Sequence, residues 1–210
     1  MLYRKKTFYR KIATTRIAKI AVLSALSYIL YLFVKFPLPF LFPSFLEIQI
    51  SDLPALIGGF MLGPIDGCVI ILVKCLLKLP LTKTSGVGEL GDVLIGIAFV
   101  LTSSLIYRRR GKNKQNAIFG LALGIAASTL VAMLVNYTLL VPFYVKVTFN
   151  GSYAVLINML QVFFPDVTEK NFDLYYIFLT VLPFNVLRGA IVAALSFLVY
   201  KRTHVLFNKF

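Results

Sequence analysis

The fold is decided by the stretch from Leu53 to Leu81, which reads LPALIGGFMLGPIDGCVIILVKCLLKLPL. The stretch is apolar almost throughout, which is typical of helices that have lipid as their solvent. The step Gly63-Pro64 interrupts it, because proline removes a helical hydrogen bond and disfavours helical backbone at the residue before it. We therefore expect two helices here, over 50–63 and 65–81, with a break between them.

The composition of the whole chain places it in a membrane. Hydrophobic residues make up 59% of the 210 residues, charged residues only 14%, and the mean hydropathy is +0.86. These values exclude a water-soluble domain of this length. The fold class predicted is all-α: one integral membrane domain over residues 1–210, built as a bundle of six transmembrane helices. Beside the two helices above, spans are expected at 17–35, 88–107, 116–143 and 177–201, and outer loops at 36–49 and 144–176.

The distribution of charge predicts how these spans are oriented. The net charge is +14, and the basic residues gather before residue 20, over 108–114 and over 201–209. Basic clusters beside spans stay cytoplasmic, and six crossings put all three clusters on that side, whereas five would not. Both termini are then cytoplasmic, and Asp66 is the one acidic residue on the inner side. The helix 50–63 is only about 21 Å long against a bilayer core of about 30 Å, so its neighbours are expected to shield it.

The motifs of ATP-driven or hydrolytic chemistry are missing from the sequence. There is no phosphate-binding loop of the G-x-x-x-x-G-K-[ST] type, and the one histidine, His204, lies in the basic C-terminal tail. We expect no catalytic residues, no metal site and no bound cofactor. Nucleic acid is not an expected partner, because the basic residues flank the spans instead of lining a polar face.

Four polar residues inside the predicted spans are candidates for ligand binding: Lys74, Asn136, Asn185 and Arg188. Such residues are costly in lipid and mark binding sites by default. Each one alone could equally tie one helix to another or reach toward the membrane surface. Asn185 and Arg188 lie three residues apart and share one helix face, which favours a ligand-binding role for this pair.

Two other groups of residues have an ordinary alternative explanation. Ala18, Ala21 and Ala25 form a stripe of small residues that lets another helix approach closely, either a partner subunit or a helix of the same bundle. Glu89 and Asp92 lie where a helix is expected to begin, so capping of the positive end of the helix dipole explains them without a ligand.

Several motifs in a fixed order resemble a known family. They are FPLPF at 36–40, LEIQISDLP at 46–54, Gly63-Pro64, Lys74, GVGE at 86–89, Asn136-Tyr137 with Pro142, and PFNVLRG at 183–189. Together they resemble the riboflavin-specific substrate-binding (S) component of energy-coupling factor (ECF) transporters, across nearly the whole chain.

The resemblance implies an S-component fold in the bacterial cell membrane, with several passes and both termini cytoplasmic. It implies that the chain captures riboflavin from outside and has no catalysis of its own. The implied partners are riboflavin, a transmembrane coupling subunit, two ATPase subunits and the lipid bilayer. The stripe Ala18, Ala21 and Ala25 would face the coupling subunit.

Carried over by position, the ligand contacts of the family come from three parts of this chain. They fall on Leu46, Glu47, Gln49, Gly86, Gly88, Asn136, Asn185 and Arg188, and Lys74 joins them as a buried candidate. Asparagine amides suit the alternating carbonyl and N–H edge of a flavin ring, and apolar walls suit its dimethylbenzene end.

The sequence departs from the family pattern at four positions. Gln49 stands where Asp is usual, Cys75 and Asp92 where Asn is usual, and Arg188 where Lys is usual. A planar guanidinium suits phosphate, so flavin mononucleotide (FMN) or another vitamin stays open as the ligand. From other classes, a self-sufficient secondary carrier and a membrane enzyme acting on lipid-like substrates stay open, although Asp66 alone is too little for the enzyme.

Overall fold

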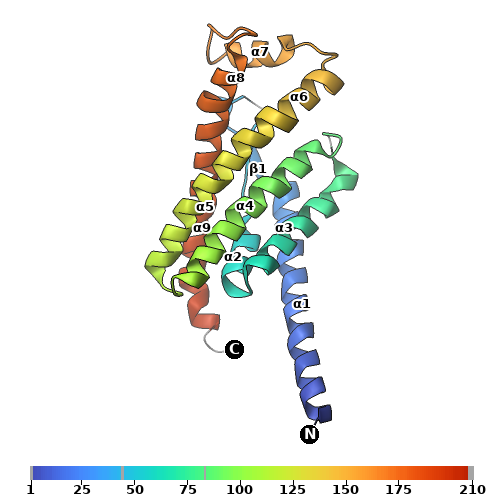
Figure 1. Ribbon diagram of the computed structural model, residues 1–210, viewed down its shortest axis with the longest axis vertical. Helices are drawn as coiled ribbons and strands as arrows, with labels where there is room; N and C mark the ends of the chain where they lie inside the picture. Colours follow the sequence, from blue (N-terminus) through green and yellow to red (C-terminus); the bar gives the residue numbers. More distant parts are fainter. Residues whose placement is uncertain (1, 44, 83, 208–210) are drawn as a thin grey trace.

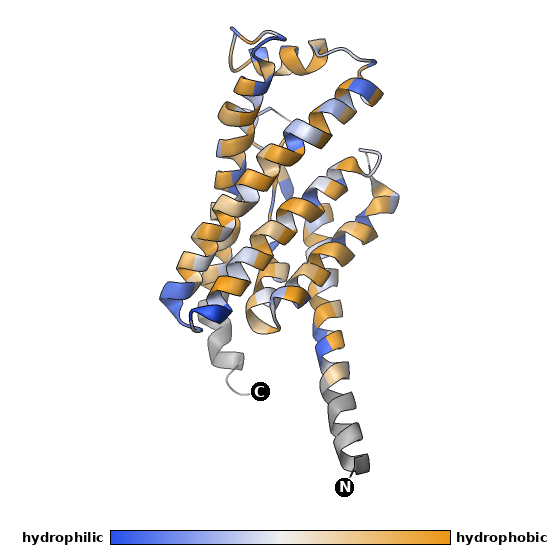
Figure 2. Cartoon of the chain, in the orientation of Figure 1, coloured by the Kyte–Doolittle hydropathy of each residue, from blue (hydrophilic) through white to orange (hydrophobic). Residues whose placement is uncertain are grey.

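The computed structural model describes residues 2–43, 45–82 and 84–207 as a bundle of helices that run mostly along one axis (Figure 1). The long helices are α1 (Leu2–Phe33), α4 (Val87–Arg109), α5 (Lys114–Val135) and α9 (Leu182–Phe207). Helices suit lipid because each backbone polar group finds its partner within the same segment. Figure 2 shows apolar residues along these helices and hydrophilic residues at the turn between α4 and α5.

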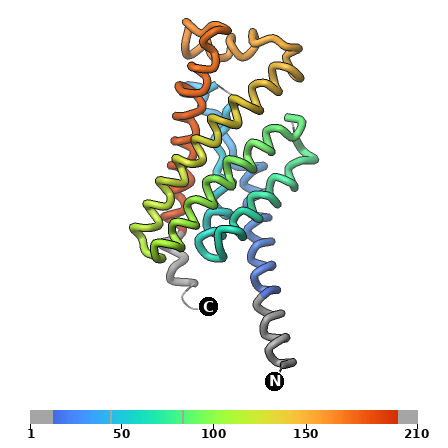
Figure 3. The backbone as a smooth tube through the Cα atoms, viewed as in Figure 1, coloured from blue at the N-terminus to red at the C-terminus, as the bar shows by residue number. Residues whose placement is uncertain are grey.

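Within the described residues, four helical segments are long and apolar enough to cross a membrane. They are Ala13–Phe33, Val87–Arg109, Lys114–Thr148 and Phe172–Val199. The two ends of the chain and the α4–α5 turn lie at one end of the molecule, and α7 (Ala154–Gln161) lies at the opposite end (Figures 1 and 3). The four segments establish a membrane protein by length and composition.

The remaining two predicted spans are shorter than a membrane. α2 (Leu53–Met61) and α3 (Pro64–Lys78) are separated by Gly63, whose φ of +144° favours glycine, and a short turn η1 (Leu79–Leu81) follows α3. α2 has 9 residues, which is about 14 Å of helix. Neither helix is among the four long ones, so the count of six spans stays a prediction.

Neighbouring helices surround α2, as its shortness requires. It contacts α1, α3, α4 and α9, and its Ala55 and Leu56 are fully buried. A Cβ at Gly67 of α3 would lie 2.5 Å from Val100 Cγ1 and 2.9 Å from the Ala55 carbonyl oxygen, so only glycine allows these helices to pack this closely. At the C-terminal end of α2, the Leu62 carbonyl oxygen accepts a hydrogen bond of 2.7 Å from Nη2 of Arg108, which supplies the partner that the helix end lacks.

The predicted loop 144–176 is wrong in part, because helix continues into it from both sides. α5 runs on through the π-helical turn η2 (Asn136–Leu140), α6 (Val141–Phe143) and a second π-helical turn, η3 (Tyr144–Thr148). α8 (Phe172–Leu174) and the π-helical η4 (Tyr175–Val181) lead into α9. Between them α7 packs Leu156 and Leu160 inward, a four-residue spacing that forms one apolar helix face.

The predicted outer loop 36–49 contains a small antiparallel ribbon within a fold that is otherwise mostly helical. β1 (Lys35–Pro37) pairs with β2 (Glu47–Gln49), with Lys35 opposite Gln49. Ile48 of β2 is fully buried and packs with Phe42 and with Phe184 of α9. The ribbon is thereby attached to the helix that contains Asn185 and Arg188.

Candidate ligand-binding site

Four charged side chains meet inside the bundle, and we call Asp52, Lys74, Asp92 and Arg188 the ion cluster. Lys74 has no exposed surface, and its ammonium group forms an ion pair with Asp52 and donates to Ser51 Oγ at 2.8 Å. Arg188 reaches both carboxylates: its Nη2 lies 2.9 Å from Asp52 Oδ2 and its Nη1 3.3 Å from Asp92 Oδ1. The cluster holds two cations and two carboxylates, so its formal charges cancel, as buried ions require.

Neutral side chains complete the ion cluster on the side of the ribbon and of α1. Gln49 Nε2 donates to both oxygens of Asp92, at 3.1 and 3.0 Å, and the Tyr31 hydroxyl donates to Asp92 Oδ2. Ser27 Oγ donates to the Ser51 carbonyl oxygen. Segment 49–52 is thus bound to α1, α3, α4 and α9 at once, so it ties four helices together at one buried polar site.

A small hollow adjoins the ion cluster. Its lining comes from α4, α5 and α9 together with one carboxylate of the cluster: Asp52, Ile95, Phe99, Ser128, Asn185, Arg188, Gly189 and Val192. Asn185 is buried, and its Nδ2 donates to the Val181 carbonyl oxygen at 2.8 Å. The pair Asn185 and Arg188 therefore shares one hollow, as the spacing of three residues predicts.

Asn136 lies in a separate contact. It begins the π-helical turn η2, and its Oδ1 accepts a hydrogen bond of 3.0 Å from the hydroxyl of Tyr176 in η4. Both side chains are buried, and the ring of Phe45 lies 6.2 Å from that of Tyr176. Because a π-helical turn contains an extra residue, it changes which side chains face the neighbouring helix, and such turns occur frequently at functional sites.

The predicted glycine contacts lie in the turn before α4, which forms a third polar group. Gly86 has φ +83° and precedes the helix, and its N–H donates to Thr82 Oγ1 at 3.1 Å, while the Gly88 N–H donates to Thr84 Oγ1 at 3.2 Å. Both threonine hydroxyls donate to the buried carboxylate of Glu89, at 2.7 and 2.9 Å. Glu89 therefore orders this turn.

The two other predicted loop contacts lie toward the surface. Glu47 pairs with Lys35 across the ribbon at 2.6 Å, with 40% of its side chain exposed. Leu46 packs against the apolar group of Phe42, Ile48 and Phe184. The structure thus brings Gln49, Lys74 and Arg188 together, with Asn185 beside them, and leaves Leu46, Glu47, Gly86, Gly88 and Asn136 in separate surroundings.

A family model for "ECF transporter, substrate-specific component" matches residues 15–200. The chain belongs to the S components of ECF transporters. It is 33% identical over 187 residues to the riboflavin transporter RibU of Staphylococcus aureus (strain TCH60), with 89% of each chain covered. It is 26% identical to the riboflavin transporter FmnP of Bacillus subtilis (strain 168), over 88% of this chain and 90% of the relative.

The solved structures agree with this assignment. A chain described under "Structure and mechanism of the S component of a bacterial ECF transporter" superposes with a TM-score of 0.68 at 28% identity, covering 93% of this chain and 98% of the other. The family resemblance expected from the motifs is confirmed, and the S components are transporter subunits, not enzymes.

The alanine stripe of this S component lies on the open side of α1. Ala18, Ala21 and Ala25 are exposed, whereas Ser24 and Ser27 of the same helix are buried against the bundle. Of the two explanations for the stripe, packing within the bundle is therefore wrong, because the described helices of this chain leave these three residues uncovered.

The helix-start role expected for Glu89 in this S component is confirmed, and the one expected for Asp92 is wrong. α4 begins at Val87 after Gly86, so Glu89 lies in its first turn, at the positive end of the helix dipole. Glu89 also accepts hydrogen bonds from the two threonines, whereas Asp92 lies one turn too deep to cap and binds Gln49, Tyr31 and Arg188. One signal in the sequence indicates the ion-pairing role of Asp92. The two cations inside apolar helices, Lys74 and Arg188, need two carboxylates, and Asp52 and Asp92 are available.

Proposed function

We propose that this S component captures riboflavin from outside the cell and passes it to an ECF coupling module. The observation that carries the proposal is the similarity to riboflavin transporters over nearly the full length of both chains. The polar site fits that role, because segment 49–52, α4 and α9 converge on buried donors and acceptors. Riboflavin is the cargo here and not a resident cofactor.

The ligand site we propose combines the residues already described. Asn185 and Arg188 beside the hollow offer donors and an acceptor to the polar edge of the ring. Leu46, Glu47 and Gln49 from the ribbon, Gly86 and Gly88 from the turn before α4, and Asn136 from η2 would close around the ligand. Lys74 acts through Asp52, because its side chain is fully buried in an ion pair.

We propose a topology of six helical crossings in the bacterial cell membrane, with α2 and α3 as the two short ones. Both termini would be cytoplasmic, since the basic clusters of the sequence lie at the end of the molecule that holds both chain ends and the α4–α5 turn. The transmembrane coupling subunit would bind the exposed stripe Ala18, Ala21 and Ala25, and two ATPase subunits would drive it.

Binding of riboflavin to the purified full-length chain tests the proposal. Quenching of flavin fluorescence should give a Kd of about 1 µM or less. Asn185→Ala should weaken binding by roughly tenfold or more, because it removes hydrogen bonds to the ligand worth about 1–2 kcal/mol. Val186→Ala is the matched control, since Val186 is the next residue and its side chain is 42% exposed on the outer face of α9.

Two results would contradict the proposal. The first is the absence of flavin binding by protein that is monodisperse and helical. The second is equal weakening by Asn185→Ala and Val186→Ala, which would mean that α9 does not present its buried face to the ligand.

A further inference from the structure

We infer that the turn between α4 and α5 binds the headgroup of an anionic phospholipid. The turn, residues 108–114, reads RRRGKNK, so five of its seven residues are basic. It joins two of the four segments that are long and apolar enough to cross a membrane, Val87–Arg109 and Lys114–Thr148, so it lies at the membrane surface. The inference concerns a part of the molecule outside the proposed ligand site and does not depend on riboflavin as the ligand.

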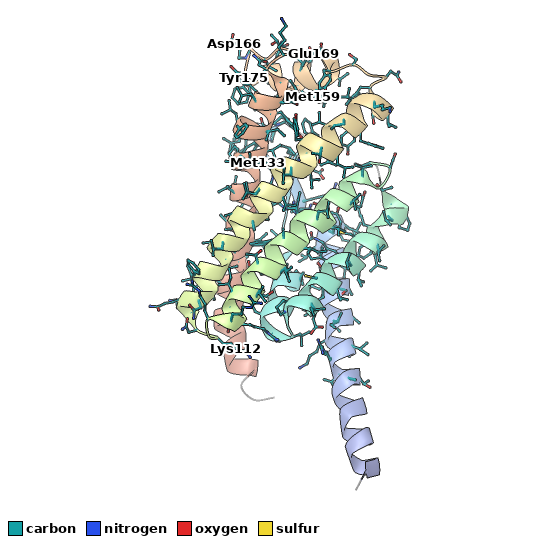
Figure 4. All side chains as sticks on the ribbon, viewed as in Figure 1. Lys112, Met133, Met159, Asp166, Glu169 and Tyr175 are labelled. Carbon is teal, nitrogen blue, oxygen red and sulfur yellow. The ribbon has the colours of Figure 1, made fainter. Side chains whose placement is uncertain are left out.

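The charge of this turn has no counterpart in the chain. In the part of the chain that the structure describes, none of its five cations forms an ion pair, and all five are exposed. Of the eight acidic residues, Asp66 is the one expected on the same side of the membrane, and Arg16 already binds both of its oxygens. Figure 4 shows Lys112 at one end of the molecule and Asp166 and Glu169 at the opposite end. The turn therefore offers unpaired positive charge to a ligand from outside the chain.

The backbone of the turn is held in place by its own side chains. Gly111 has φ +100°, which favours glycine, and Nδ2 of Asn116 donates to the carbonyl oxygens of Arg110 and Gly111, at 2.7 and 2.9 Å. The side chain of Asn113 accepts from the Asn116 N–H at 2.8 Å and so caps α5. Since these backbone groups already have partners, the turn meets a ligand with its cationic side chains.

Apolar surface for an acyl chain lies directly beside the cations. The guanidinium carbon of Arg110 lies 4.4 Å from the ring centroid of Phe119, and Nζ of Lys114 lies 5.3 Å from that of Phe197 in α9. Phe119 is 40% exposed, and so is Leu123, one helical turn further along α5. Cations at the end of a lipid-facing helix surface match a phospholipid, which places a phosphate above an acyl chain. A free phosphate would use the cations alone.

The position of the turn favours lipid over a protein partner. In Figure 1 the α4–α5 turn lies on the opposite side of the view from α1, which contains the alanine stripe proposed to bind the coupling subunit. The turn is thus left to the membrane when that subunit is bound. Clusters of four to eight basic residues directly beside a membrane span are typical of binding to anionic lipids.

The experiment uses tryptophan fluorescence, because the chain has no tryptophan of its own. Phe119→Trp places a single reporter beside Arg110 in the full-length protein, reconstituted in mixtures of phosphatidylcholine and phosphatidylglycerol of which one lipid is brominated. Bromine quenches a nearby tryptophan, so the quenching measures which lipid lies at the turn. Phosphatidylglycerol should be favoured about threefold or more at about 0.1 M salt, and the preference should fall at about 1 M salt, where charges are screened beyond about 3 Å.

Two double variants of the Phe119→Trp protein are compared. Arg110→Gln/Lys112→Gln should reduce the preference to about one, because it removes two cations of the turn. Lys146→Gln/Lys170→Gln is the matched control, since it removes two exposed cations elsewhere in the chain and should keep the preference. Arg110→Lys, which keeps the charge, should keep the preference as well.

Three results would overturn the inference. They are equal quenching by the two lipids in the reporter protein, the same loss of preference in both double variants, and a preference that does not change with salt. The first would leave an acidic protein surface as the partner of the turn, and the second would mean that total charge sets the preference. If Arg110→Gln/Lys112→Gln does not fold, Lys112→Gln alone replaces it and should still lower the preference.

Discussion

Removing the carboxylate of Asp52 should destabilise the protein more than removing the ammonium group of Lys74, although the two form one ion pair. Asp52 accepts from both Lys74 and Arg188, and its side chain is 4% exposed. In Asp52→Asn, Arg188 still has Asp92, whereas Lys74, which has no exposed surface, loses the carboxylate with which it pairs. In Lys74→Met the carboxylate of Asp52 still has Arg188 at 2.9 Å.

The magnitude follows from the cost of leaving a buried charge without its partner, which is about 3–5 kcal/mol. We expect Asp52→Asn to lose about that much stability, and Lys74→Met less. The double variant Asp52→Asn/Lys74→Met restores the charge balance, because Arg188 and Asp92 remain as a matched pair. It should therefore be more stable than Asp52→Asn alone, with a coupling between the two sites of about 1–3 kcal/mol.

Thermal unfolding in detergent, followed by far-ultraviolet circular dichroism, is the suitable assay because the chain is mostly helical and has no tryptophan. A loss of about 3–5 kcal/mol should lower the Tm by roughly 10 °C in a chain of this size. The reasoning is refuted if Asp52→Asn melts with the wild type, or if the double variant melts at or below Asp52→Asn.

Two further changes test the packing of the short helices and the proposed coupling surface. Gly67→Ala should destabilise the protein by about 1–3 kcal/mol, seen as a lower Tm, because the added methyl group meets the Ala55 carbonyl; an unchanged Tm would mean that α2 and α3 are not in close contact. Ala21→Leu should abolish uptake by the assembled transporter while riboflavin binding stays intact, whereas Ala122→Leu, at an exposed alanine of α5, should leave both unchanged. Equal uptake by the two alanine variants would contradict a coupling role for α1.

The parts of the fold that follow from local chemistry could be predicted from the sequence. The long apolar segments predict the long helices, and Gly63-Pro64 lies between α2 and α3, where the loss of a helical hydrogen bond places a break. The burial of Lys74, Asn185 and Arg188 follows from their positions within apolar segments. Each of these inferences needs only the neighbouring residues.

The partners in the site could not be predicted in this way. Arg188 meets Asp52 across 136 positions of the chain, and no periodicity connects them. The π-helical turns have no recognisable composition, so neither the continuation of α5 beyond Pro142 nor the contact of Asn136 with Tyr176 follows from a helical repeat. The sequence pattern predicts a helix end at Asp92, since its partner Gln49 is 43 residues away, in a ribbon that the pattern predicts as loop.

The ion cluster also has a consequence for the order in which the chain assembles during synthesis. Asp52 leaves the ribosome shortly before Lys74, so the first ion pair can form as soon as α2 and α3 have been made. Arg188 leaves the ribosome much later, and its two carboxylates lie in segments made 96 and 136 residues earlier. We therefore expect α9 to bring Arg188 to carboxylates that are already in place, so that α9 completes the site instead of starting it.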